Sequence, residues 1–172
     1  MKKTSLIAAL VIGAGVSLSA QADDNDALAR FKGGIGSQPL RSGAAVNDVK
    51  GVNPGGRPWV IESLEAEVKP NGHIRVSGRG LLLAGGDGVG RTNNLSVHAR
   101  LFCGNDSFNS ATVPLDPDGD FRIEGMLSSV PPSPCDTPIL LIVSGVAPAG
   151  SWFAAGIPRL PKHTPSPFGL SK

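Results

Sequence analysis

The chain has 172 residues with 16 basic and 14 acidic side chains, and it contains two cysteines, 23 glycines and 15 prolines. This near-neutral balance excludes the basic surface that a nucleic-acid-binding protein needs, and it gives no support for binding to a membrane surface. A chain of this length can bury one core, so we expect one folded domain.

The N-terminal residues predict a secretory signal peptide over residues 1–22. Lys2 and Lys3 precede an apolar or small run over residues 6–18, and Ala-Gln-Ala at residues 20–22 is typical of a cleavage site. The apolar run is too short to span a bilayer. We therefore expect an exported protein, periplasmic or secreted, without a membrane span after cleavage. Removal of residues 1–22 leaves 150 residues with 14 basic and 14 acidic side chains.

The rest of the chain divides by composition into three parts. Residues 23–57 are rich in glycine and proline, and we interpret them as an extended, partly mobile lead-in with one short helical turn over residues 26–32. Residues 58–157 carry the strand pattern of the folded domain. Residues 158–172 contain four prolines and few apolar residues, which predicts a flexible tail.

Alternation of apolar and polar residues predicts about seven short strands in the central part. The pattern covers residues 59–68, with an irregularity near Ile61, and residues 74–82, 95–103, 112–115, 121–127, 139–143 and 152–157. The run at 139–143 is continuously apolar, which is typical of a strand buried on both faces. The fold class that follows is all-β, a single Ig-like or related β-sandwich.

Two segments of this pattern resemble each other. Residues 69–78 read KPNGHIRVSG and residues 116–125 read DPDGDFRIEG, so that proline, glycine, arginine and a second glycine coincide. Pro-Asn-Gly and Pro-Asp-Gly are turn sequences, because proline presets one dihedral angle and glycine accepts a positive φ. Each copy therefore predicts a hairpin turn that leads into an alternating strand.

The second copy also resembles a known family. Residues 116–127, DPDGDFRIEGML, look like the turn-and-strand signature of carboxypeptidase-regulatory-like (transthyretin-like) β-sandwich domains. The Pro-Gly-x-Tyr ending of that signature is missing, since the chain has no tyrosine. The resemblance implies a sandwich that serves as a non-catalytic accessory or binding domain.

Cys103 and Cys135 are the two cysteines, and both lie in the part expected to be exported. An oxidising compartment favours a disulfide between them. The alternative, a reactive or metal-binding thiol, lacks a histidine at ligand spacing and a C-x-x-C arrangement.

Residues 85–92, GGDGVGRT, resemble a phosphate-binding loop in which Arg91 replaces the lysine. Such a loop must open into a helix, whereas the sequence after Thr92 continues with Asn93, Asn94 and a strand pattern. We therefore interpret the segment as a wide turn between strands and expect no bound nucleotide and no other cofactor.

Polar side chains near this turn are the candidate binding residues, because loops on a rigid scaffold commonly carry binding. The alternative is that they merely suit a turn. The candidates are Arg79, Asp87, Arg91, Thr92, Asn93, Asn94, His98 and Arg100. His98 belongs to the polar side of an alternating strand, which predicts a solvent-exposed ring or a role in a polar network.

No pattern of catalytic or metal-binding residues is complete. Asp116, Asp118 and Asp120 have the spacing of a calcium loop, but Phe121 and Leu127 stand where glycine and glutamate belong. We therefore expect no metal site.

These observations favour an exported, non-catalytic binding or envelope-structural protein whose ligand or protein partner the sequence does not identify. One alternative is a secreted hydrolase or lyase assembled from dispersed residues, with Asp87, His98 and Arg100 as participants. Another is an adhesive or assembly subunit.

Overall fold

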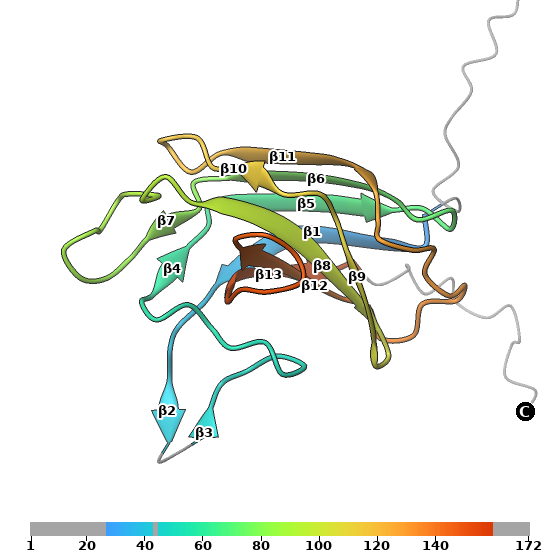
Figure 1. Ribbon diagram of the computed structural model, residues 1–172, viewed down its shortest axis with the longest axis horizontal. Helices are drawn as coiled ribbons and strands as arrows, with labels where there is room; N and C mark the ends of the chain where they lie inside the picture. Colours follow the sequence, from blue (N-terminus) through green and yellow to red (C-terminus); the bar gives the residue numbers. More distant parts are fainter. Residues whose placement is uncertain (1–26, 43–44, 160–172) are drawn as a thin grey trace, which may run out of the picture.

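The computed structural model describes residues 27–42 and 45–159, which contain thirteen strands and no helix (Figure 1). None of these residues belongs to a helix that could cross a membrane. The strands are β1 (Ala29–Gly36), β2 (Arg41–Ser42), β3 (Ala45–Val46), β4 (Trp59–Val60), β5 (Ser63–Val68), β6 (His73–Arg79), β7 (Leu82–Leu83), β8 (Ser96–Cys103), β9 (Asp106–Asn109), β10 (Val113–Pro114), β11 (Phe121–Met126), β12 (Ile139–Ser144) and β13 (Trp152–Pro158).

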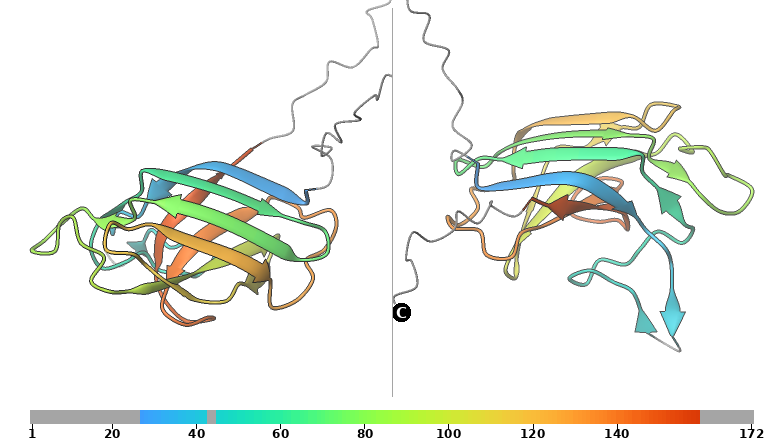
Figure 2. Two further views of the ribbon diagram at one scale, coloured as in Figure 1. Left: turned by 90° about the horizontal axis from the view of Figure 1, so that it is seen from above. Right: turned by 180° about the vertical axis from the view of Figure 1, so that it is seen from behind.

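Nine strands form one antiparallel sheet that curls over on itself (Figures 1 and 2). Its order is β10-β8-β12-β13-β1-β5-β6-β11, and β9 also pairs with β8. The curl brings β10 against β11, and the N–H of Ser128 after β11 donates a 2.8 Å hydrogen bond to the carbonyl of Asn109 in β9. The predicted all-β, sandwich-like fold is confirmed. Its two layers, β8, β12 and β13 on one side and β1, β5, β6 and β11 on the other, belong to one continuous sheet and are joined where β13 pairs with β1.

The core lies between the two layers and is built by the alternating strands. In β5, β6 and β11 every second side chain points inward, and Leu64, Val76 and Ile123 are at most 1% exposed. Leu140 and Ile142 of β12 meet them from the opposite layer. The free energy that stabilises the fold comes mainly from removing these side chains from water.

The predicted disulfide is present. Cys103 at the end of β8 is bonded to Cys135, which precedes β12, and their Cα atoms are 4.9 Å apart. Both residues are buried within the inner core. The bridge therefore fastens two neighbouring parts of the β8–β12 layer.

The two similar segments pair with each other, which the sequence comparison alone does not reveal. β6 lies antiparallel to β11 with Val76 opposite Ile123, and these two residues occupy equivalent positions in the two copies. The copies are consequently related by a local twofold axis through this pair. Gly78 lies opposite Phe121, and a Cβ at Gly78 would stand 2.2 Å from the phenyl ring, so glycine is required there.

The turns before the two strands have the same geometry. Gly72 and Gly119 occupy equivalent positions, and each has a φ of +85°. Gly72 N–H donates to the carbonyl of Lys69, and Gly119 N–H donates to the carbonyl of Asp116, each at 2.9 Å. The predicted turn and the strand after it are confirmed in both copies, but only the first turn closes a hairpin, between β5 and β6, because β11 pairs with β6 and not with β10.

The predicted lead-in is wrong for residues 29–36, because they form β1 at the centre of the sheet, between β13 and β5. No helical turn forms over the described part of residues 26–32. The glycines of β1 do not interrupt the strand. They make room for close neighbours, since a Cβ at Gly34 would lie 2.9 Å from Ile61 and one at Gly36 would lie 2.0 Å from the carbonyl oxygen of Trp59.

Other boundaries differ less. The strand predicted over residues 59–68 is divided into β4 and β5 near the expected irregularity, and β12 is buried on both faces as predicted. The pattern did not predict β9 or the small hairpin of β2 and β3. The signal peptide and residues 160–172 of the predicted tail lie outside the described residues.

Candidate functional site

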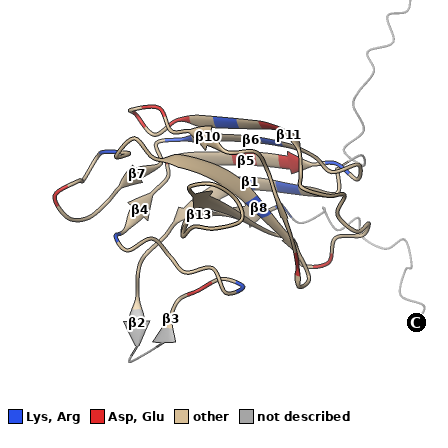
Figure 3. Ribbon diagram, in the orientation of Figure 1, with Lys and Arg blue, Asp and Glu red and all other residues tan. Residues whose placement is uncertain are grey.

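Basic and acidic residues lie on β1, β5, β6 and β11 (Figure 3), and the strand register places those of the outer surface in two rows that run across the strands. The register fixes the members of each row. The first row is Arg30, Glu67, Arg75 and Glu124, and the second is Lys32, Glu65, Ser77 and Arg122. We call these eight residues the charged face, in which seven positions carry a charge.

Opposite charges pair along the first row. Arg30 Nε lies 3.1 Å from Glu67 Oε2, and Arg75 Nη2 lies 2.6 Å from Glu124 Oε1. The hydrogen bond and charge of Arg75 hold the pKa of the Glu124 carboxyl below its usual value, and the same contact raises the pKa of Arg75. Because opposite charges stand opposite each other across the strands, ion pairs link β1 to β5 and β6 to β11 along this row.

The second row is less completely paired. Lys32 Nζ lies 3.7 Å from Glu65 Oε1, and Arg122 Nη2 lies 3.6 Å from Glu124 Oε2, a carboxylate that already binds Arg75. Ser77 stands between Glu65 and Arg122 in this row. Positive charge is therefore in excess toward the β11 side of the face.

A groove of about 520 Å³ runs over β1, β5 and β6 within this face. Its charged lining is Arg30, Lys32, Glu65, Glu67, Arg75 and Arg159. These four basic and two acidic side chains give the groove a formal charge of +2. Arg159 is held beside it because its N–H donates a 2.8 Å hydrogen bond to the carbonyl of Arg30.

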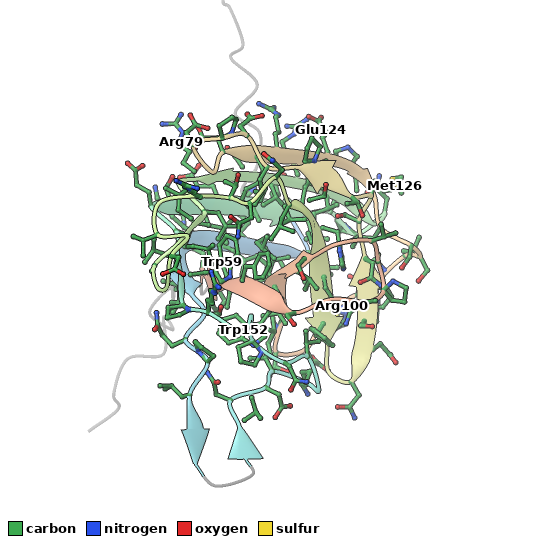
Figure 4. All side chains as sticks on the ribbon, turned by 60° about the vertical axis from the view of Figure 1, so that its left-hand side comes forward. Trp59, Arg79, Arg100, Glu124, Met126 and Trp152 are labelled. Atoms are coloured by element: carbon green, nitrogen blue, oxygen red, sulfur yellow. A yellow bond between two sulfur atoms is a disulfide. The ribbon has the colours of Figure 1, made fainter. Side chains whose placement is uncertain are left out.

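The outer surface of β8, β12 and β13 is apolar and covered. Phe102, Leu141, Val143 and Trp152 are at most 6% exposed and form a second cluster with Val52. The segment that carries Val52 is attached to β13, since Trp152 N–H donates to the carbonyl of Asn53 at 2.9 Å. This side of the sheet consequently offers little free surface. Figure 4 shows that Trp152 and Arg100, on the covered side, lie far from Arg79 and Glu124, on the side of the charged face.

His98 lies on this covered side and is fully buried, so the prediction of a solvent-exposed ring is wrong. Val143 of β12 is opposite it, and the loop after β12 supplies the 2.9 Å contact between His98 Nδ1 and the carbonyl of Gly145. Nε2 has no hydrogen-bond partner among the described residues. Burial lowers the pKa of His98, the hydrogen bond to Gly145 raises it, and the charge of Arg100 lowers it further.

The structure does not bring the predicted binding residues into one site. Four of them are exposed on the loop between β7 and β8, namely Asp87, Arg91, Asn93 and Asn94, whereas Thr92 of this loop is buried. Arg100 is half-buried and its Nε donates a 2.8 Å hydrogen bond to Asn109. Arg79 ends β6 on the same side of the sheet as the charged face.

The segment GGDGVGRT forms the predicted turn between strands. Gly90 N–H donates to the carbonyl of Leu83, and Leu83 N–H donates to the carbonyl of Arg91, so the loop closes on its own base. Asn93 and Asn94 both have a φ of +53°, and β8 follows in place of a helix. The backbone thus lacks the helix N-terminus that a phosphate-binding loop requires.

Several kinds of site are not found among residues 27–42 and 45–159. Their aromatic side chains are all buried, so none offers a stacking surface for a base or a sugar ring. No group of three or more His, Cys, Asp or Glu side chains is placed to hold a metal ion. The turn with Asp116 and Asp118 connects β10 to β11 and is closed by the hydrogen bond from Gly119 N–H to the carbonyl of Asp116, and Asp120 accepts a 3.0 Å hydrogen bond from the N–H of Gly80.

Comparison with family models, curated proteins and solved structures gave no match for this chain. The resemblance of residues 116–127 to carboxypeptidase-regulatory-like domains therefore stays a prediction.

None of the eight residues of the charged face was among the binding residues predicted from the sequence. Glu65 and Glu67 are recognisable as one polar strand side, but their partners come from β1, whose alternation of Ala29, Arg30, Phe31 and Lys32 was obscured by the glycines that follow. The similarity of the two segments was a further signal in the sequence, but only their pairing in the structure places Arg75 beside Glu124.

Proposed function

We propose that the chain is an exported, non-catalytic binding protein that contacts a charged ligand with its charged face. The observation that carries this proposal is the ordered pair of rows, which is hollowed into a groove with an excess of positive charge. The ligand is bound by ion pairs, because no aromatic side chain of the described residues is exposed for stacking.

The opposite side of the sheet supports the absence of catalysis. A hydrolase or lyase built on His98 needs its ring to reach a substrate, and a general base must come within hydrogen-bond distance of the proton that it removes. His98 is 0% exposed and is held against Gly145. Asp87 is exposed on the β7–β8 loop, and no hydrogen bond or ion pair joins it to His98 or Arg100 in the described part of the chain.

The binding proposal is tested by retention on an immobilised sulfated polysaccharide in a salt gradient. We expect the protein to be retained at low ionic strength and to elute as salt screens the groove. The variant K32Q/R75Q/R122Q removes three positive charges from the face and should elute at clearly lower salt.

A matched control, K50Q/R57Q/R91Q, removes three exposed positive charges elsewhere, including that of the β7–β8 loop. The control lowers the net charge as much as the face variant does, but it should elute at the same salt concentration as the wild type. Equal elution of the two variants would refute the charged face as the binding surface, and loss confined to the control would assign binding to the surface that carries Lys50, Arg57 and Arg91.

The export proposal is supported by the Cys103–Cys135 disulfide, since such bonds persist in oxidising compartments. The test is expression of the full chain in a bacterium, followed by fractionation and mass measurement. We expect a periplasmic or secreted product that begins at Asp23, and an intact chain retained in the cytosol would contradict export.

A further inference from the structure

We infer that the charged face holds a tetrahedral oxyanion, a phosphate or sulfate ester group, above Ser77 between Arg75, Arg79 and Arg122. This inference rests on the proposed function and names the chemistry that the face selects. It starts from Ser77 because this is the uncharged position among the eight residues of the face.

Ser77 is exposed, and its hydroxyl makes no hydrogen bond to any described residue. It lies in the middle of β6, where alternate side chains point to the same side of the sheet. Arg75 and Arg79 are the two neighbours on that side, each about 7 Å away along the strand. Arg122 is directly opposite on β11. Three arginine residues are therefore the strand neighbours of one free hydroxyl on three sides, and the guanidinium groups of two of them, Arg75 and Arg122, contact Glu124.

The acidic side chains nearby leave one of these three arginines, Arg79, without an ion pair among the described residues. Glu124 is bound to Arg75 at 2.6 Å and lies 3.6 Å from Arg122, so one carboxylate serves two cations. Asp120 lies at the Arg79 end of β11 and accepts the N–H of Gly80. Arg79 forms no ion pair with a described acidic residue.

The fourth neighbour of Ser77 is Glu65, opposite on β5 and 3.7 Å from Lys32. Its negative charge opposes an anion on that side. The oxyanion must therefore sit toward β11, where Arg79 and Arg122 approach it. Planar guanidinium groups donate two parallel hydrogen bonds to phosphate or sulfate oxygens, and the serine hydroxyl supplies one more donor.

The experiment is an NMR titration of the exported, disulfide-bonded protein with inorganic phosphate at constant ionic strength, held by chloride. We expect saturable amide shifts at Ser77, Gly78 and Arg122. Arg79→Gln and Arg122→Gln should each weaken binding about three- to fivefold, the effect of one exposed ion pair. Glu65→Gln should strengthen it by a similar factor, a gain that a purely structural role of Glu65 does not predict.

Arg57→Gln serves as the matched control and should bind phosphate as the wild type does. Inorganic sulfate, titrated in parallel, tests the second source of the same oxyanion, and binding of either ion at Ser77 supports the inference. Shifts that chloride reproduces, unchanged binding in R79Q and R122Q, or acetate binding as tightly as phosphate would each overturn it.

The outcome is separable from that of the proposed function. If K32Q/R75Q/R122Q loses retention on the polysaccharide while phosphate fails to bind at Ser77, the charged face binds its ligand without an oxyanion site. If retention does not depend on the face and phosphate still binds at Ser77, the anion site stands and the broader binding surface is wrong.

Discussion

The two layers of the curled sheet share one inner core but differ on their outer surfaces. The layer of β1, β5, β6 and β11 exposes two rows of charged side chains, whereas the layer of β8, β12 and β13 carries an apolar surface covered by the chain near Val52. The difference shows that stability and an exposed polar surface are provided by different layers of one sheet. The covered layer contributes burial on both sides, and the exposed layer keeps a polar surface free for binding.

The disulfide is expected to have the largest effect on this comparison, because it belongs to the covered layer. Replacing both Cys103 and Cys135 by alanine should lower the free energy of unfolding by about 3–4 kcal/mol, the entropy term for a closed loop of this length. Urea denaturation measures the loss, and hydrogen exchange should show earlier opening of β8 and β12 than of β5 and β6. Equal loss of protection in both layers would show that the bridge supports the whole sheet.

Leu141→Ala tests the covered surface directly. Its side chain is fully buried on the outer side of β12, and the truncation should cost about 2–3 kcal/mol through lost burial and an unfilled cavity. Glu65→Ala at an outer position of the charged layer is the matched change and should alter stability by less than about 0.5 kcal/mol. Similar costs for the two variants, measured by thermal or urea unfolding, would contradict the division of tasks.

The same division explains which parts of the fold could be predicted from sequence. β5, β6 and β11 alternate cleanly because one side is dry and the other is wet, so their pattern predicts both strand and orientation. β8 also alternates in sequence, but its second side is covered by chain from a distant segment. No local pattern indicates that cover, so the sequence left a solvent-exposed ring and a polar network as alternatives for His98, which is buried and contacts the carbonyl of Gly145.

β1 and the charged face were hidden for a different reason. Gly34 and Gly36 look like strand breakers, yet both positions have no room for a Cβ. Chain segments from β4, from β5 and from the connection between these two strands approach too closely. Without β1, the pairs Arg30–Glu67 and Lys32–Glu65 cannot be inferred, because long-range register depends on tertiary packing. The turn chemistry of Gly72 and Gly119, in contrast, is local and was predictable.

The buried histidine gives the stability of the covered layer a pH dependence near its ordinary pKa. The pKa of His98 is lowered from its ordinary value of 6.5, chiefly by burial and also by the charge of Arg100. Below pH 6.5 His98 is protonated in the unfolded chain but stays neutral in the folded chain until its lowered pKa is reached. The free energy of unfolding should therefore fall as the pH decreases through this region. Melting temperatures of wild type and His98→Asn between pH 8 and pH 5 measure it.

In His98→Asn the decrease in stability below pH 6.5 should be smaller than in the wild type. The asparagine amide can still donate to the carbonyl of Gly145, which His98 Nδ1 now contacts. Parallel profiles for wild type and His98→Asn would mean that His98 does not control the decrease.

The smallest expected effect lies on the charged layer and decides whether its rows are ordered in solution. Arg75 holds the pKa of Glu124 below its ordinary value. The pair therefore stabilises the fold fully at a pH above the ordinary pKa, and this stabilisation is lost as the pH falls through the lowered pKa. In Arg75→Gln the Glu124 carboxyl should titrate closer to its ordinary value, as followed by NMR of the side-chain carboxyl carbon. Arg122→Gln should move it less, because Arg122 lies 3.6 Å from Glu124 and Arg75 lies 2.6 Å from it. If Glu124 titrates at its ordinary value in the wild type, the rows are not held together by their charges, and the charged layer is only a solvated surface.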